Sequence, residues 1–160
     1  MNSIKNKLIL KLTIALSIFI LCAAYFIQYI LKKEACNLCL IERLPYLSAI
    51  ILIIFTFYSK NKEKLIIGVL SIIFTIGTII SFYHYGIEQG FFSESLVCDL
   101  KNLSFNVTKE SILKELENNS ISCKEVTFRI FNLSLATINM FISLLLSLTY
   151  TKIYFYYEKN

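Results

Sequence analysis

The stretch LIIGVLSIIFTIGTIISFYHY, residues 65–85, is 21 residues long and contains no Asp, Glu, Lys or Arg. A helix that crosses a membrane needs about 20 mostly apolar residues. Such a segment should be helical, because the bilayer offers no water and the backbone must satisfy its own hydrogen bonds. Three other long apolar runs occur in the chain. We therefore expect four transmembrane helices, at about residues 8–31, 39–58, 65–87 and 128–150.

The composition favours a membrane bundle over a soluble one. Hydrophobic residues make up 56% of the chain, against about 45–50% in soluble domains. Helices of a soluble bundle would each show a charged face, and these runs show almost none. The first run, residues 8–31, exceeds the apolar core of about 7–15 residues in a signal peptide, so we expect it to remain as an anchor. The fold class expected is all-α, a four-transmembrane-helix bundle forming a single integral membrane domain over residues 1–160.

The lysines predict the orientation, because cytoplasmic segments of membrane proteins are enriched in Lys and Arg. The loops at 32–38 and 88–127 also hold basic residues, but acidic residues outweigh them in the longer loop. Both termini should therefore be cytoplasmic and both loops exported. The net charge of +5 then reflects topology, and no basic stripe interleaved with aromatic residues suggests nucleic-acid binding. Eight lysines lie in three short segments on the expected cytoplasmic side: Lys5, Lys7, Lys11, Lys60, Lys62, Lys64, Lys152 and Lys159.

Four of the five cysteines fall in or beside the expected exported loops. Cys22 lies within the first span, where a thiol usually serves as an inert apolar packing residue. Disulfides persist outside the cytoplasmic membrane, and four cysteines allow three pairings. Grouping by loop favours Cys36–Cys39 and Cys98–Cys123 as one resting state.

The C-x-x-C spacing of Cys36 and Cys39 favours redox chemistry. Such a bridge closes almost no loop and adds little stability, whereas tight bridges are easily reduced and re-formed. A four-cysteine zinc site typically uses C-x-x-C twice, but 24 residues separate Cys98 from Cys123, so we expect no metal. Leu40 stands where a haem-attachment motif would have histidine, and no βαβ pattern indicates a thioredoxin domain.

Arg43 and Glu42 follow the C-x-x-C motif at the membrane edge. If a helix covers residues 39–43, Arg43 shares a face with Cys39, and both the helix N-terminus and the cation favour the Cys39 thiolate. Alternatively, Arg43 extends to lipid head groups with Glu42 as its companion. On the membrane side, only a lipid-soluble carrier can re-oxidise a thiol pair, and a quinone accepts the two electrons that one disulfide requires.

The segment CNLCLIER, residues 36–43, resembles the first exported loop of the DsbB family of disulfide bond formation proteins. FYHYGIEQGFFSESLVC, residues 82–98, is also similar to that family, and the likeness extends over four spans and both cysteine pairs. The resemblance implies a thiol oxidoreductase in the bacterial inner membrane, with its cysteine loops in the periplasm.

The resemblance also implies roles for individual residues. Cys98 and Cys123 would oxidise a periplasmic DsbA-like thioredoxin-fold protein, with Cys98 forming the mixed disulfide. Electrons would pass to Cys36 and Cys39 through a transient Cys36–Cys123 bridge. Cys39 would then reduce a quinone, ubiquinone or menaquinone, which the respiratory chain recycles. The quinone would lie near Arg43, with His84 bordering the same pocket.

Two other functions compete with this interpretation. One is a non-enzymatic four-span protein whose loops are braced by disulfides. The other is an enzyme that reduces a quinone-like vitamin, although in such reductases the C-x-x-C motif is expected on a later span. Within the second loop, TKESILKELEN, residues 108–118, predicts a short amphipathic helix on the membrane surface, and a solvated loop is the alternative.

Overall fold

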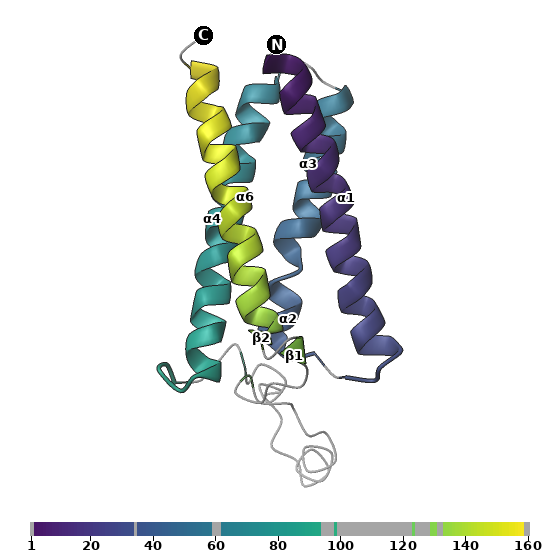
Figure 1. The fold of residues 1–160 in the computed structure, drawn as a ribbon, viewed down its shortest axis with the longest axis vertical. Coiled ribbons are helices and arrows are strands. Elements are labelled where there is room, and N and C mark those ends of the chain that lie inside the picture. Colours follow the sequence, from purple (N-terminus) through teal and green to yellow (C-terminus); the bar gives the residue numbers. More distant parts are fainter. Residues whose placement is uncertain are drawn as a thin grey trace, which may run out of the picture.

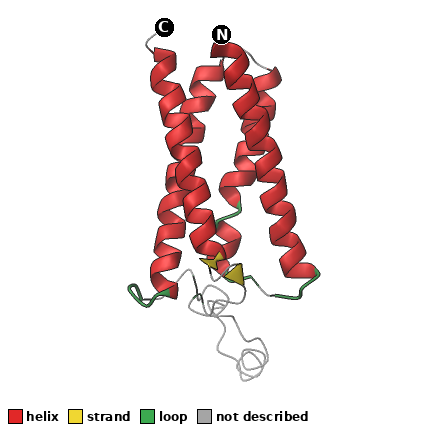
Figure 2. Cartoon of the chain, viewed as in Figure 1, coloured by secondary structure: helices red, strands yellow, loops and turns green. Residues whose placement is uncertain are grey.

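The chain is almost entirely helical in our computed structural model (Figures 1 and 2), which describes residues 2–33, 35–58, 62–93, 98, 123, 129–130 and 133–158. The elements run in the order α1 (Asn2–Tyr29), α2 (Asn37–Ile41), α3 (Leu44–Tyr58), α4 (Glu63–Glu88), β1 (Arg129–Ile130), β2 (Leu133–Ser134) and α6 (Leu135–Glu158).

Within these residues, four helical segments are long and apolar enough to cross a membrane. Large apolar side chains point outward from them; Phe19 is 70% exposed and Leu145 is 65% exposed. Such a surface would be costly in water and suits a bilayer. The expected four-helix membrane bundle is confirmed. The segments are Lys7–Tyr29, Asn37–Tyr58, Glu63–Glu88 and Leu135–Tyr156.

The last helix begins later than its apolar run suggested, at Leu135 instead of near residue 128. Ser134 explains this start, because its Oγ accepts the backbone N–H of Thr137 at 3.1 Å and so caps the helix. Before the cap, β1 and β2 pair antiparallel, with Ile130 opposite Leu133. The helix expected at 108–118 lies outside the described residues.

The second span is broken between α2 and α3. Pro45 is the second residue of α3, a first-turn position where its missing N–H costs no helical hydrogen bond. Glu42 and Arg43 form the turn before it, and the N–H of Arg43 reaches back to the carbonyl of Leu40 at 3.2 Å. A helix continuing through residues 39–43 was therefore the wrong expectation, since α2 ends at Ile41. Because of this break, the side chains of Glu42 and Arg43 point to different partners.

The core of the bundle is aromatic and hydrogen-bonded. The ring of Phe74 on α4 lies between those of Tyr46 and Tyr150, with both centroid distances at 5.9 Å. The hydroxyl of Tyr150 donates to Thr13 Oγ1 at 2.7 Å and joins α6 to α1. Between membrane helices, such side-chain hydrogen bonds supply specificity that apolar packing alone does not.

The two termini lie at one end of the bundle, and α2 and the β hairpin lie at the other (Figure 1). Four spans connected in sequence return the chain to the end of the bundle where it began. Cys22 on α1 is exposed on the outside of the bundle. It is therefore not a packing residue of the bundle interior, as its place in an apolar run had suggested.

Candidate redox site

The two cysteine pairs meet at the end of the bundle opposite the termini. Cys36, Cys98 and Cys123 are buried in one cluster with Leu38 and Ile87. Cys98 and Cys123 form a disulfide, as the grouping by loop suggested, whereas Cys36 and Cys39 are free thiols. The structure thus brings all four cysteines predicted to be catalytic to one region.

Cys36, not Cys39, occupies the N-terminus of α2. Its backbone is extended (φ −67°, ψ 165°), and its Sγ accepts the backbone N–H of Cys39 at 3.2 Å. A sulfur in this position replaces the side-chain oxygen that usually caps a helix. The sequence suggested this position for Cys39 if a helix covered residues 39–43, and the structure places Cys36 there instead.

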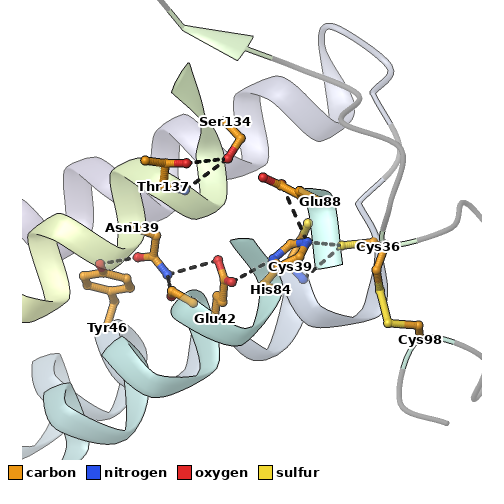
Figure 3. Close-up of polar contacts among 12 residues, drawn as sticks. Cys36, Cys39, Glu42, Tyr46, His84, Glu88, Cys98, Ser134, Thr137 and Asn139 are labelled. Atoms are coloured by element: carbon orange, nitrogen blue, oxygen red, sulfur yellow. Dashed lines mark hydrogen bonds and ion pairs between the residues drawn. A yellow bond between two sulfur atoms is a disulfide. The ribbon is translucent and has the colours of Figure 1, made fainter. Parts of the chain in front are cut away.

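His84 on α4 reaches the same sulfur from the opposite side. Its Nε2 lies 3.5 Å from Cys36 Sγ, and its Nδ1 lies 2.8 Å from Glu42 Oε1 (Figure 3). Both His84 and Glu42 are buried. The carboxylate fixes the orientation of the imidazole, which in turn faces the thiol. His84 therefore belongs to the cysteine site.

These contacts favour the Cys36 thiolate. Cys36 stands immediately before the membrane-spanning segment that begins at Asn37. Hydrogen bonding from Cys39, followed by hydrogen bonding and charge from His84, lowers the pKa of Cys36 from 9.0 to about 5 despite the opposing effect of burial. A thiol with such a pKa is ionised at neutral pH and is both reactive and a good leaving group.

A chain of polar side chains continues from Glu42 into the bundle (Figure 3). Asn139 on α6 donates to Glu42 Oε2 at 3.0 Å and to Ser81 Oγ at 2.7 Å, and the Tyr46 hydroxyl donates to the Asn139 carbonyl oxygen. Tyr46 also contacts Ser143 Oγ at 3.2 Å. Sequence reasoning missed this chain. The available signal was an amide within the fourth apolar run, because polar residues inside membranes are costly and mark function.

Arg43 turns towards α1. Its Nη1 donates to Gln28 Oε1 at 2.7 Å, and its guanidinium carbon lies 5.0 Å from the centre of the Tyr25 ring. Arg43 therefore does not share a helix face with Cys39. The turn before α3 directs Glu42 to the cysteine site and Arg43 to the first span.

A bundle of membrane-spanning helices with a free C-x-x-C pair packed against a disulfide defines a membrane protein built for thiol–disulfide chemistry. The family profile described as "Disulfide bond formation protein DsbB" matches residues 6–152, and the chain belongs to this family. Membership gives it a role as a thiol oxidoreductase in disulfide bond formation. It also fits the inner membrane, where the family acts.

One relative is similar to the chain over nearly the full length of both proteins. "Uncharacterized protein RP370" of Rickettsia prowazekii (strain Madrid E) is 26% identical over 158 residues, which covers 98% of this chain and 92% of the relative. No solved structure matches the chain.

Proposed function

We propose that this protein re-oxidises a periplasmic DsbA-like thioredoxin-fold protein and passes the electrons to a membrane quinone. The quinone, ubiquinone or menaquinone, would be recycled by the respiratory chain. The observation that carries the proposal is the burial of Cys36 in one cluster with the Cys98–Cys123 disulfide. Pairs in contact can exchange electrons within one molecule. Disulfides that merely brace loops need no such contact, and Cys36 and Cys39 would then have no reason to be free thiols.

The proposed relay has three exchanges. The partner's dithiol reduces the Cys98–Cys123 disulfide through a mixed disulfide at Cys98, and leaves oxidised. The Cys123 thiolate then attacks Cys36 in the Cys36–Cys39 disulfide, forms a Cys36–Cys123 bond and releases Cys39. Finally, the Cys98 thiolate attacks Cys123 and releases Cys36. The bonds at this end point are those of the structure, with one disulfide and two free thiols.

The surroundings of Cys36 favour its release in the last exchange. The N–H of Cys39 and the imidazole of His84 both approach its Sγ, so negative charge on the sulfur is stabilised. Glu42 holds the imidazole in place through Nδ1. A stabilised leaving thiolate leaves faster, which favours transfer of electrons from the second pair to the first.

The residues around Arg43 fit a quinone head group. A guanidinium carries five N–H donors, and the hydrogen bond to Gln28 uses one. Leu40 and Leu44 beside it are 42% and 58% exposed and suit an apolar ligand. When bound, the quinone would accept the two electrons that the Cys36–Cys39 pair loses as its disulfide closes, together with the proton of Cys39 and one proton from water, because Cys36 is already ionised at neutral pH.

We assign the two pocket residues different tasks. Arg43 donates hydrogen bonds to a quinone oxygen and stabilises negative charge on it. We propose that His84 borders the bound quinone from the cysteine side; its observed contact is with Cys36. Cys39 is less buried than Cys36, which makes it the thiol that meets the acceptor.

The orientation belongs to the same proposal. Lysine-rich short segments at the opposite end favour a cytoplasmic position for both termini, so the cysteine site faces the periplasm. A membrane-impermeant thiol reagent added to spheroplasts should then label Cys98 and Cys123 after reduction. Labelling that requires lysis would contradict this orientation.

Thiol trapping in membranes, with and without added quinone, tests the function. After reduction, Cys36 and Cys39 should become oxidised again only when quinone is added, and Cys39→Ala should abolish this. Arg43→His should raise the quinone KM about 10- to 100-fold, from the loss of a charge-assisted hydrogen bond of about 1.5–3 kcal/mol. Arg129→His is the matched control, because Arg129 is an exposed arginine on β1. Cysteines that stay oxidised whatever the quinone supply would instead support a protein with disulfide-braced loops.

A further inference from the structure

A buried carboxylate next to the cysteine site has no evident role in the relay. The Glu88 side chain on α4 is 6% exposed, and its Oε1 lies 3.9 Å from His84 Nε2. Its Oε2 is buried and has no hydrogen-bond partner among the described residues. Buried polar atoms almost always have a partner, so this oxygen could accept a further ligand, while the same carboxyl group also interacts with Ser134.

The neighbours of Glu88 are ligands for a soft divalent cation. Cys36 Sγ, Cys39 Sγ and a ring nitrogen of His84 lie within 4.8 Å of one another. Figure 3 shows these groups converging with the Glu88 carboxylate. With Glu88 they form a set of two sulfurs, one imidazole nitrogen and one carboxylate oxygen. Four ligands of these kinds are typical of tetrahedral zinc.

The distances agree with a zinc ion. Zinc binds sulfur at about 2.3 Å and imidazole nitrogen at about 2.0–2.1 Å, so a tetrahedral ion separates these ligands by about 3.6 Å. Cys36 Sγ and His84 Nε2 are 3.5 Å apart. Zinc would separate a Glu88 oxygen from the His84 nitrogen by about 3.3 Å, and the observed distance is 3.9 Å. Glu88 lies outside the group of atoms within 4.8 Å of one another, so its carboxylate must move towards the sulfurs to become the fourth ligand.

Glu42 would orient the His84 ring without binding the metal itself. A proton on His84 Nδ1, donated to Glu42 Oε1 at 2.8 Å, leaves the Nε2 lone pair for the metal. Zinc-binding histidines usually donate their other N–H to a carboxylate in this way. Thiolate ligands exclude the hard cations Mg²⁺ and Ca²⁺, and the imidazole and carboxylate suit Zn²⁺ better than Cu⁺.

We propose that the reduced site binds one Zn²⁺ ion through Cys36, Cys39, His84 and Glu88. This site differs from the four-cysteine arrangement considered above, because it uses one cysteine pair and two residues of α4. The ion occupies both sulfurs and holds the C-x-x-C pair reduced. Inhibition of the relay by zinc follows if the proposed function is correct, but binding itself does not depend on that function.

Zinc titration of the purified protein, with a chromophoric zinc indicator as competitor, tests the proposal. Protein reduced with a phosphine and then freed of it should bind one Zn²⁺ per chain, and protein oxidised at Cys36–Cys39 should not. Glu42→Gln should weaken binding about 10- to 100-fold. His84→Ala and Glu88→Gln should weaken it at least as much, since each loses a direct ligand. Cys22→Ser is the control and should bind as the wild type does.

Two outcomes would overturn the proposal. One is the absence of stoichiometric binding by the reduced wild type. The other is equal affinity in the reduced and oxidised proteins, which means adventitious metal on the surface. Comparing redox states of the wild type avoids reliance on variants that fold poorly. Since no quinone or partner is present, failure of the relay and failure of the zinc site remain distinguishable.

Discussion

Replacing His84 with asparagine should raise the pKa of Cys36 while keeping the contact with Glu42. The Asn side-chain amide can take the place of Nδ1 but cannot reach the sulfur from the position of Nε2. The lost hydrogen bond to a charged acceptor is worth about 1.5–3 kcal/mol, which is about 1–2 pKa units. The pKa of Cys36, about 5 in the wild type, should therefore rise to about 6–7. It should stay below 9.0, because the hydrogen bonding from Cys39 remains.

The lowered pKa links the stability of the reduced protein to pH. Because the folded pKa is below the unfolded one, the stabilisation is complete above pH 9.0 and is lost as pH falls through about 5. At pH 7 it amounts to about 3 kcal/mol, from two pKa units at about 1.36 kcal/mol each. Stabilising the reduced form by this amount raises the reduction potential of the Cys36–Cys39 pair by about 60 mV. Electron transfer into the pair becomes easier by the same amount.

The assay is the pH dependence of alkylation of the reduced protein, with the label on Cys36 located by fragment mass spectrometry. His84→Gln serves as the control, because its longer amide can reach the sulfur in place of Nε2, and its midpoint should stay closer to that of the wild type. A wild-type midpoint near pH 9 would refute the reasoning. So would an His84→Asn midpoint equal to that of the wild type.

Two further predictions concern the polar contacts between helices. Asn139→Leu keeps the volume of the side chain but removes the amide that donates to Glu42 Oε2. The free energy of unfolding, measured in detergent by a thermal or denaturant melt, should fall by about 1–3 kcal/mol. An unchanged melt would show that water satisfies the carboxylate. Tyr150→Phe removes the hydrogen bond to Thr13 and should lower the free energy of unfolding by about 0.5–1.5 kcal/mol. Tyr156→Phe is the control and should not change it measurably, because the Tyr156 side chain is 62% exposed. Equal effects of the two variants would contradict the assigned role of Tyr150.

The sequence predicts the bundle well because the membrane imposes strict requirements. A run such as residues 65–85 has few alternatives to a spanning helix, and α4 covers it. The start of α6 was harder to predict, because its position depends on a single cap at Ser134 and not on apolar content. Pro45 fits either the first turn of a helix or a kink within one, so the residue alone does not show that α3 begins at Leu44. The choice between them depends on packing.

The candidate site was predictable in its cysteines and less so in its geometry. Chain spacing identifies Cys36 and Cys39 as a pair, but it does not show that Cys36 caps α2 or that Arg43 turns to α1. These directions follow from the break before α3. The role of Asn139 depends on α6 packing beside α4. Its contact with Ser81, for example, joins residues that are 58 positions apart in the chain. No local pattern encodes such a contact.

The capping role of Cys36 makes the first turn of α2 sensitive to oxidation. A five-residue helix cannot nucleate by itself, so it relies on its cap and on packing. When Cys36 enters a disulfide, its sulfur loses the negative charge that attracts the N–H of Cys39, and a cap worth about 0.5–2 kcal/mol is weakened. The segment around Cys36 then becomes more mobile when the Cys36 sulfur must reach another cysteine. It becomes ordered again once Cys36 is released as a thiolate. The redox state of Cys36 thus controls how mobile the first turn of α2 is.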